Sequence, residues 1–157
     1  MDIRKLSIKD CTQIAEVYCE EENIIITELY LDKLKNAFTK IIDKGDFVLG
    51  AFKEDILAGC ISVHLMYDTY PGYTDGPYAH IETMIIKKEY RNIGVGSELL
   101  RKAVEELSSQ NVTYIIIQTG EYNIAARRSI EKAGFGLENV NYIIKFDNNI
   151  QNALTTG

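Results

Sequence analysis

The sequence contains no long apolar run. Runs such as Ile115-Ile116-Ile117 are far shorter than the roughly 20 apolar residues with which a helix crosses a bilayer. The first residues, Met1-Asp2-Ile3-Arg4, show no basic stretch followed by the apolar core of a secretion signal. We therefore expect a cytoplasmic protein with no membrane partner.

Cysteine and histidine are also scarce. The cysteines, Cys11, Cys19 and Cys60, are odd in number and match no zinc-binding spacing, so we expect reduced thiols and no metal. A catalytic cysteine would need a base, and the histidines are His64 and His80. His64 follows Cys60 along one expected strand, which is weak evidence for a nucleophilic pair.

A strongly basic stretch is missing as well, and the net charge is -6. Neutralisation of phosphates by basic side chains dominates nucleic-acid binding, so we do not expect nucleic acid as a partner. An acidic balance suits a cationic substrate, but a solvated acidic surface produces the same composition. Charge alone therefore leaves the partner open.

The composition itself is that of an ordinary globular protein. Hydrophobic residues make up 46% of the 157 residues and charged residues 25%, with no internal repeat. A chain of this length is enough for one domain with a substantial core. We expect that domain to span residues 1–147 and to be followed by a polar tail, 148–157.

Apolar spacing and turn residues predict the elements of the N-terminal half. Asp10 and Gln13 resemble a capping box that opens a helix, and Gly45 is placed to end a second helix. The expected elements are a strand at 3–6, a helix from residue 10, a helix carrying Leu31, Leu34, Phe38 and Ile41, and strands at 47–52 and 56–66.

The C-terminal half follows a loop at 67–77. Asn123 and Gly134 are placed to begin and end a short helix. The other expected elements are strands at 79–86, 113–118, 135–137 and 142–146, and an amphipathic helix carrying Leu99, Leu100, Ala103, Val104 and Leu107. Because strands and helices alternate, we expect an α/β or α+β domain with a mixed sheet.

The most informative segment is Arg91-Asn92-Ile93-Gly94-Val95-Gly96, hereafter the glycine loop. It lies between a buried strand and the amphipathic helix. The first amides of a helix have no partner within the helix, and the helix dipole places about half a positive charge there. Gly94 and Gly96 let an anion approach the main chain, and Arg91 adds a positive charge. The loop is therefore suited to bind a pyrophosphate.

Two other phosphate-binding loops fit poorly. A nucleoside-triphosphate loop needs Gly-Lys-Ser/Thr where Leu99 stands, and a dinucleotide fingerprint needs a third glycine at the same position. That fingerprint also needs an acidic residue at the end of the next strand, where Gln118 stands. A tight turn that needs glycines for packing alone remains open.

The glycine loop resembles motif A of the GNAT superfamily of N-acetyltransferases, Arg/Gln-x-x-Gly-x-Gly/Ala. A second stretch, with Asn123, Ala126, Glu131-Lys132 and Gly134-Phe135, resembles that superfamily's motif B. The likeness covers about residues 79–135. It implies a mixed, mostly antiparallel sheet whose central strands splay apart between flanking helices, and acetyl-CoA as the acetyl donor.

The resemblance also implies a set of coenzyme-binding residues. The central strand would pair its main chain with the pantetheine arm, the loop amides would hold the pyrophosphate, and the motif B asparagine would contact the arm. The residues so implied are Met84, Ile85, Ile86, Arg91, Asn92, Ile93, Gly94, Val95, Gly96, Ser97 and Asn123.

Acetyl transfer to an amine also needs a base, because an amine with a pKa of about 10.4 is mostly protonated at pH 7. Glu82 is our first candidate, since many superfamily members place a carboxylate at this strand position, and His80 is the second. The main-chain amide of Met84 is the expected oxyanion donor. The superfamily's usual tyrosine acid is replaced by Ile130, and Tyr122 or Tyr142 could substitute.

The acceptor cannot be identified from the sequence, and we expect an amine of a small molecule or a peptide. The loop at 67–78, with Asp68 and Asp75, could frame a cationic acceptor, be a mobile loop without such a role, or form a contact in a homodimer. Because Ile130 replaces the tyrosine, a non-catalytic sensor or regulatory module that binds acyl-CoA is the alternative to an enzyme.

Overall fold

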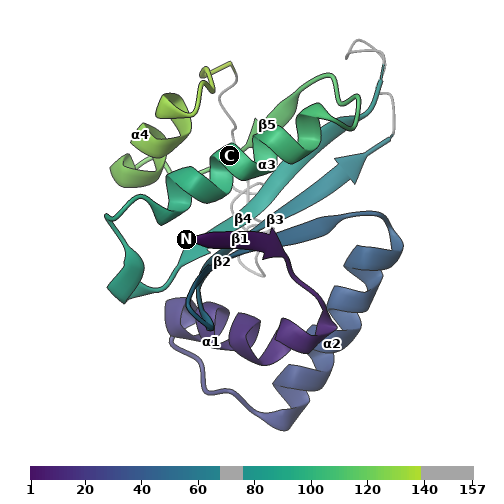
Figure 1. The fold of residues 1–157 in the computed structure, drawn as a ribbon, viewed down its shortest axis with the longest axis vertical. Helices are drawn as coiled ribbons and strands as arrows, with labels where there is room; N and C mark the ends of the chain where they lie inside the picture. Colours follow the sequence, from purple (N-terminus) through teal and green to yellow (C-terminus); the bar gives the residue numbers. More distant parts are fainter. Residues whose placement is uncertain (68–75, 139–157) are drawn as a thin grey trace, which may run out of the picture.

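The computed structural model describes residues 1–67 and 76–138, which form one sheet with helices on both faces (Figure 1). In chain order the elements are β1 (Asp2–Lys5), the 3-10 turn η1 (Ile8–Asp10), α1 (Cys11–Glu22), α2 (Glu28–Asp43), β2 (Phe47–Lys53), β3 (Ile56–Met66), β4 (Tyr78–Ile86), the 3-10 turn η2 (Lys88–Tyr90), α3 (Val95–Ser108), β5 (Ile115–Ile117) and α4 (Ile124–Lys132).

The strands lie in the order β1-β2-β3-β4-β5, and all neighbours are antiparallel except β4 and β5. These two run parallel but pair only from Ala79 to Ile81 on β4 and from Ile115 to Ile117 on β5. Beyond that point β4 continues to Ile86 without β5 beside it. The sheet is therefore mixed and mostly antiparallel with splayed central strands, which confirms the expected fold class.

Each face of the sheet carries its own core. One face packs against α3, whose buried residues include Leu99, Leu100 and Leu107, and the other packs against α1 and α2 through Ile14, Val17 and Phe38 (Figure 1). Burying a side chain of this size stabilises the fold by roughly 1.5–3 kcal/mol. These two cores fix β4 between the layers and thereby fix the site that β4 carries.

Most of the predicted helix boundaries are confirmed. Gly45 follows the end of α2 with φ +84°, and Asn123 caps α4, which Gly134 follows with φ +96°. The capping box of Asp10 and Gln13 is wrong, since the Asp10 side chain accepts hydrogen bonds from Arg4 and Ser7 instead. Oε1 of Gln13 accepts a hydrogen bond from the main-chain amide of Leu57, at 2.7 Å.

Two strand predictions need correction. Residues 135–137 do not form a strand, because the chain leaves α4 at Gly134 without joining the sheet. The strand at 113–118 is shorter than expected, since its pairing with β4 ends at Ile117. The predicted strand at 142–146, the domain end at 147 and the tail at 148–157 lie outside the described residues.

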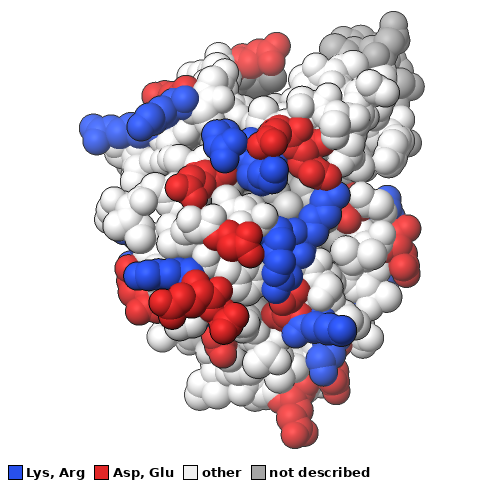
Figure 2. Space-filling model, viewed as in Figure 1, with Lys and Arg blue, Asp and Glu red and all other residues white. Residues whose placement is uncertain are grey.

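Acidic and basic side chains alternate over the face seen in Figure 2, with no continuous basic patch there. Within residues 1–67 and 76–138, no helix is both long and apolar enough to cross a membrane. The same residues contain no group of three or more histidine, cysteine, aspartate or glutamate side chains placed to hold a metal ion.

Candidate active site

Glu82 is an extra residue in β4. Ser62 and Val63, which are consecutive on β3, face Thr83 and Ile81 on β4, so Glu82 has no opposite residue. Such a β-bulge reverses the side-chain alternation of the strand that carries it. Before the bulge Ala79 and Ile81 face α3, and after it Met84 and Ile86 do.

The bulge also redirects the main-chain amides of β4. The amide of Lys87 donates to the carbonyl of Ala58 on β3, 2.9 Å away. By strand alternation the amide of Ile85 faces β3 as well, and those of Met84 and Ile86 face the opposite edge. The β5 strand has already ended at that edge. Two amides therefore point into the opening between the splayed strands.

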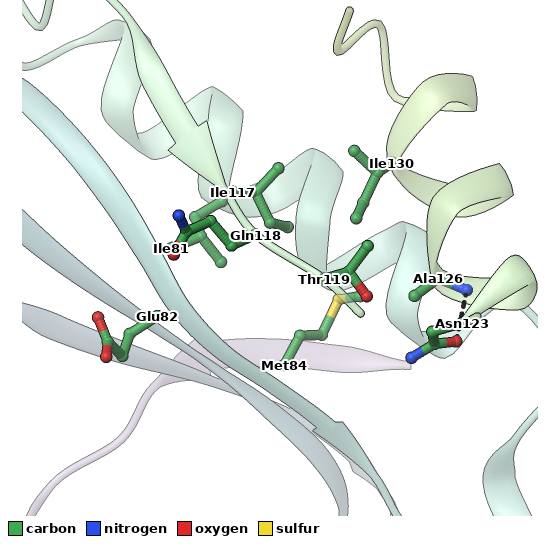
Figure 3. A pocket seen from close by; sticks show the side chains of 9 residues that line it. All are labelled: Ile81, Glu82, Met84, Ile117, Gln118, Thr119, Asn123, Ala126 and Ile130. Carbon is green, nitrogen blue, oxygen red and sulfur yellow. Dashed lines mark hydrogen bonds between the residues drawn. The ribbon is translucent and has the colours of Figure 1, made fainter. Parts of the chain in front are cut away.

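This opening forms a pocket closed by α4 (Figure 3). Its side chains come from β4, from β5 and the residues after it, and from α4. They belong to Ile81, Glu82, Met84, Ile117, Gln118, Thr119, Asn123, Ala126 and Ile130. Figure 3 shows Glu82 on the opposite side of β4 from Ile81, at the edge of an otherwise mostly apolar opening. A carboxylate thus borders a pocket into which main-chain donors point.

The glycine loop begins α3 beside this pocket. The first hydrogen bond that enters the helix joins the amide of Glu98 to the carbonyl of Gly94, at 3.0 Å. The amides of Val95, Gly96 and Ser97 therefore precede the helical hydrogen bonds. Val95 is buried in the core, whereas Asn92 and Ile93 are exposed. The helix is thus anchored while its first turn lies at the surface, as an anion site requires.

The two loop glycines have different conformations. Gly94 is the N-cap of α3 with φ +93°, a left-handed conformation that favours glycine. A Cβ on Gly96 would lie 3.7 Å from Met84, an ordinary contact, and Gly96 has no positive φ. The backbone conformation therefore explains a glycine at 94, whereas neither conformation nor packing among the described residues explains one at 96. This weakens the view that both glycines serve the turn alone.

Arg91 is held within the protein. Its Nε donates to the carbonyl of Ile86, 2.9 Å away, and its Nη2 forms an ion pair with Glu21 at the end of α1. Lys88 also contacts α1, since its main-chain amide donates a hydrogen bond to the Glu20 side chain. Because Glu21 offsets its charge, Arg91 fixes the shape of the loop more than it adds free positive charge.

Among the described residues, the Asn123 side chain has a hydrogen-bond partner at one of its two polar atoms. Its Oδ1 accepts the amide of Ala126 at 3.1 Å and so caps α4. Figure 3 shows Nδ2 on the other side, facing the opening near Met84. The cap thereby orients a donor toward the pocket.

Not every predicted residue reaches the opening. The Ile85 side chain packs against the core under α1 and α2. Tyr122 is 89% exposed and does not line the pocket, and Tyr142 lies outside the described residues. Ile130 extends from α4 toward Ile117, so an aliphatic group occupies the place of the superfamily's tyrosine (Figure 3).

The structure brings the two candidate bases together. Nδ1 of His80 lies 3.2 Å from Oε2 of Glu82, with side-chain exposures of 26% and 56%. This contact is an ion pair when the imidazole is protonated. The pair is solvent-accessible and can exchange protons with water.

The cysteine alternative does not survive. Cys60 is fully buried, and burial raises the pKa of its thiol to about 12. The His64 side chain is hydrogen-bonded to Asp46 instead, with Nδ1 of His64 2.8 Å from Oδ2 of Asp46. A thiol that stays protonated and lacks a base is no nucleophile.

Several site residues were missed by the sequence reasoning. Thr119 lines the pocket two residues after the end of β5, and the polar pair Gln118-Thr119 following an apolar strand was the available signal. The pairing of His64 with Asp46 had no local signal, because the two residues lie on different elements.

Comparisons with known proteins agree with this geometry. The sequence matches the acetyltransferase (GNAT) family over residues 10–135, and no curated protein matches it. A putative acetyltransferase from Agrobacterium tumefaciens str. C58 has a TM-score of 0.78 and 18% identity, over 93% of this chain and 100% of its own.

Two further solved structures share the fold. A transcriptional regulator from Bacillus halodurans C-125 has a TM-score of 0.80 and 21% identity, over 92% of this chain and 99% of its own. An aminoglycoside N-acetyltransferase in complex with CoA has a TM-score of 0.71 and 15% identity, over 93% and 100%. At these identities the structures show the fold, whereas the sequence match extends over most of the chain. The chain therefore belongs to the acetyltransferase (GNAT) family of acyltransferases.

Proposed function

We propose that this protein is an acetyl-CoA-dependent N-acetyltransferase that transfers an acetyl group to an amine of a small molecule or peptide by direct attack, with Glu82 as the base. One observation carries the proposal. Glu82, which lies 3.2 Å from His80, lines the opening between β4 and β5 together with Met84. The amides that precede the helical hydrogen bonds of α3 lie beside this opening, since a Cβ added at Gly96 would lie 3.7 Å from the Met84 side chain.

The coenzyme would lie along this opening. Its pyrophosphate would accept hydrogen bonds from the amides of Val95, Gly96 and Ser97, where the helix dipole favours negative charge. The main chain of β4 at Met84 and Ile86 would pair with the pantetheine arm, and Nδ2 of Asn123 would donate to it. The similar aminoglycoside acetyltransferase binds CoA, which supports the choice of coenzyme.

In the reaction, the neutral amine attacks the thioester carbonyl carbon and the C–S bond breaks. The amine proton goes to Glu82, directly or through water, and the thiolate leaves. The amide of Met84 would stabilise the tetrahedral oxyanion. Deprotonating an amine of pKa about 10.4 at pH 7 costs roughly 4–5 kcal/mol, which a carboxylate paired with His80 helps to offset.

The departing thiolate has no tyrosine beside it among the described pocket residues. A thiol with a pKa near 8.5 is already an adequate leaving group at neutral pH. We therefore propose that the thiolate leaves unprotonated and takes its proton from solvent, unless Tyr142 supplies it.

The acceptor is proposed only by class. The candidate aspartates Asp68 and Asp75 lie outside the described residues, and the fold serves unrelated acceptors. A cytoplasmic location and a homodimer remain predictions.

A non-catalytic acyl-CoA sensor is the second candidate. Two observations favour it: Ile130 stands in the pocket in place of an acid, and the similar Bacillus halodurans protein is a transcriptional regulator. The bordering Glu82 favours the enzyme, because a sensor needs no base at that place.

Release of free thiol from acetyl-CoA over a broad panel of amines separates the two candidates. Turnover that falls in Glu82→Gln while coenzyme affinity stays unchanged supports the enzyme. Tight coenzyme binding with no turnover on any amine supports the sensor. No binding of the coenzyme at all contradicts both.

A further inference from the structure

The end of α1 carries negative charge where a helix disfavours it. Glu20, Glu21 and Glu22 are consecutive in the last turn, which holds no basic residue. The helix dipole is negative at a C-terminus, so acidic side chains destabilise the helix there. A helix end of this kind is stabilised by basic partners from elsewhere in the chain.

Those partners lie in the turn that joins β4 to the glycine loop. Arg91 forms its ion pair with Glu21 at the end of α1. Nearer the middle of the same helix, Oε2 of Glu16 lies 3.1 Å from Nζ of Lys87. The entrance of the proposed pyrophosphate site is therefore fastened to α1 by acidic side chains.

The Arg91 guanidinium has donors to spare. Of its five N–H groups, one on Nε donates to the carbonyl of Ile86 and one on Nη2 donates to Glu21. Arg91 has no further side-chain partner among the described residues, and its side chain is 39% exposed. The bond to Ile86 holds the guanidinium beside the loop even when the contact with Glu21 is lost.

We propose that Glu21 competes with the pyrophosphate of the coenzyme for Arg91 and thereby limits the affinity for the coenzyme. This inference rests on the proposed function, because it assigns a role at the same coenzyme site. Arg91 precedes the loop amides that would hold the pyrophosphate, so its free donors and the phosphates would be neighbours.

The direction of the effect follows from charge. An ion pair with a carboxylate offsets the positive charge that Arg91 presents to a phosphate. Removing the charge of Glu21 therefore strengthens the binding of CoA. If Glu21 only held the loop in shape, its replacement would weaken binding instead, so the two roles predict opposite signs.

Glu21→Gln is the first variant, because glutamine keeps an oxygen acceptor for Arg91 and loses the charge. We expect CoA to bind about three- to tenfold more tightly at low ionic strength, measured by calorimetry, and the gain to shrink at about 0.15 M salt. Every other charge of the chain is the same in both proteins. Glu21→Ala should act in the same direction and decides the matter if Glu21→Gln does not fold. Unchanged or weaker binding overturns the proposal.

Glu16→Gln is the matched control. Glu16 lies on the same helix, is 47% exposed against 42% for Glu21, and pairs with a lysine that is only 12% exposed. Both variants have the same net charge, so a difference between them reflects position. We expect Glu16→Gln to change the affinity for CoA by less than about twofold. An equal gain in both variants would show a general effect of net charge and would overturn the proposal.

Two shorter ligands identify the phosphate concerned. The compound 3′-dephospho-CoA keeps the pyrophosphate and lacks the 3′-phosphate, and pantetheine lacks phosphate altogether. We expect the gain in Glu21→Gln to persist with 3′-dephospho-CoA and to be absent with pantetheine. A gain confined to CoA would assign Arg91 to the 3′-phosphate, and a gain with pantetheine would show a change in the pocket itself. Either result overturns the proposal.

A double-mutant cycle tests whether the competition is for Arg91. Arg91→Gln removes the positive charge, and glutamine is the alternative residue at this place in motif A. We expect Glu21→Gln to strengthen CoA binding by less than about twofold when residue 91 is already glutamine. Equal gains with and without Arg91 would show that Glu21 repels the coenzyme directly and would overturn the competition.

The binding measurements separate this inference from the proposed function. If the wild type does not bind CoA, both fail. If it binds CoA and acetylates an amine, but Glu21→Gln binds CoA no more tightly, the function stands and this inference fails. If the variant binds more tightly and no amine is acetylated, the transferase fails and the competition for Arg91 stands.

Discussion

The two halves of the site are built from different parts of the chain. The proposed coenzyme half would consist mainly of main-chain amides, at Met84, Ile86 and the first turn of α3. The proposed proton half consists of the His80 and Glu82 side chains on β4, at the bulge that the pairing with β3 produces. Main-chain donors depend on local conformation, whereas the side-chain pairs depend on the register between strands. The first half should therefore tolerate most side-chain changes, and the second should not.

The largest effect should come from the proton half. We expect Glu82→Gln to lower kcat/KM about 10²- to 10³-fold, because general-base catalysis contributes on this scale. The affinity for CoA, measured by calorimetry, should stay within about twofold. Glu105→Gln is the matched control, since Glu105 is equally exposed at 55% but lies on α3 in ion pairs with Arg101 and Lys102. Equal activity losses in both variants would contradict a role for Glu82.

A buried aspartate outside the site should affect stability alone. The hydrogen bond from Arg4 is the main cause that lowers the pKa of Asp10 to about 2. A lowered folded-state pKa means that this stability is present above about pH 4 and is lost as the pH falls toward 2. We expect Asp10→Asn to lose about 2 kcal/mol at neutral pH and to flatten acid unfolding in that window, followed by circular dichroism. Loss of CoA binding in this variant, under conditions where it is folded, would contradict the claim that Asp10 affects stability alone.

The coenzyme half should respond to a single added methyl group. Gly96→Ala should weaken CoA binding about tenfold, or 1.4 kcal/mol, while the melting temperature stays unchanged. The reason is that its Cβ fits the protein at 3.7 Å but narrows the approach to the main chain. Unchanged affinity would show that Gly96 does not border the pyrophosphate.

A pair of glycines separates strain from binding. Gly94 and Gly45 have similar φ values of +93° and +84°, and a Cβ added at either position would meet no neighbouring group within 4 Å. Alanine at either position should therefore cost roughly 1–2 kcal/mol of stability, from the left-handed backbone alone. Only Gly94→Ala should also weaken CoA binding, so an equal loss of affinity in Gly45→Ala would contradict the assignment of the loop.

The smallest effect concerns the missing acid. Ile130→Tyr places a phenol in the pocket, and a phenol loses its proton near pH 10. We expect a rate change of no more than a few-fold at pH 7 and a new decline of kcat above about pH 10. A wild-type enzyme that already shows this decline would instead point to another tyrosine, such as Tyr142.

The local structure of the proposed coenzyme half could be predicted because its signals are contiguous in sequence. A glycine at the helix start, an aliphatic strand before it and an asparagine at the next helix each act on their own neighbours. The structure accordingly placed Gly94 at the N-cap of α3 and Asn123 at that of α4. Arg91 shows the limit, since its charge is offset by Glu21 from α1.

The proton half could not be predicted in the same way. The bulge at Glu82 arises from how β3 pairs with β4, which no stretch of either strand reveals alone. The same register places His64 opposite His80, and Asp46 reaches His64 from a separate connection. The predicted capping box failed for a related reason, because Arg4 and Ser7 compete for Asp10.

The most direct test is an amide NMR titration of the ¹⁵N-labelled protein with CoA and, separately, with pantetheine, which lacks the pyrophosphate. If main-chain donors at the helix start hold the phosphates, the amides of Val95, Gly96 and Ser97 shift with CoA and stay in place with pantetheine. If these amide signals do not shift with CoA, or shift equally with both compounds, the main chain at the start of α3 does not hold the phosphates.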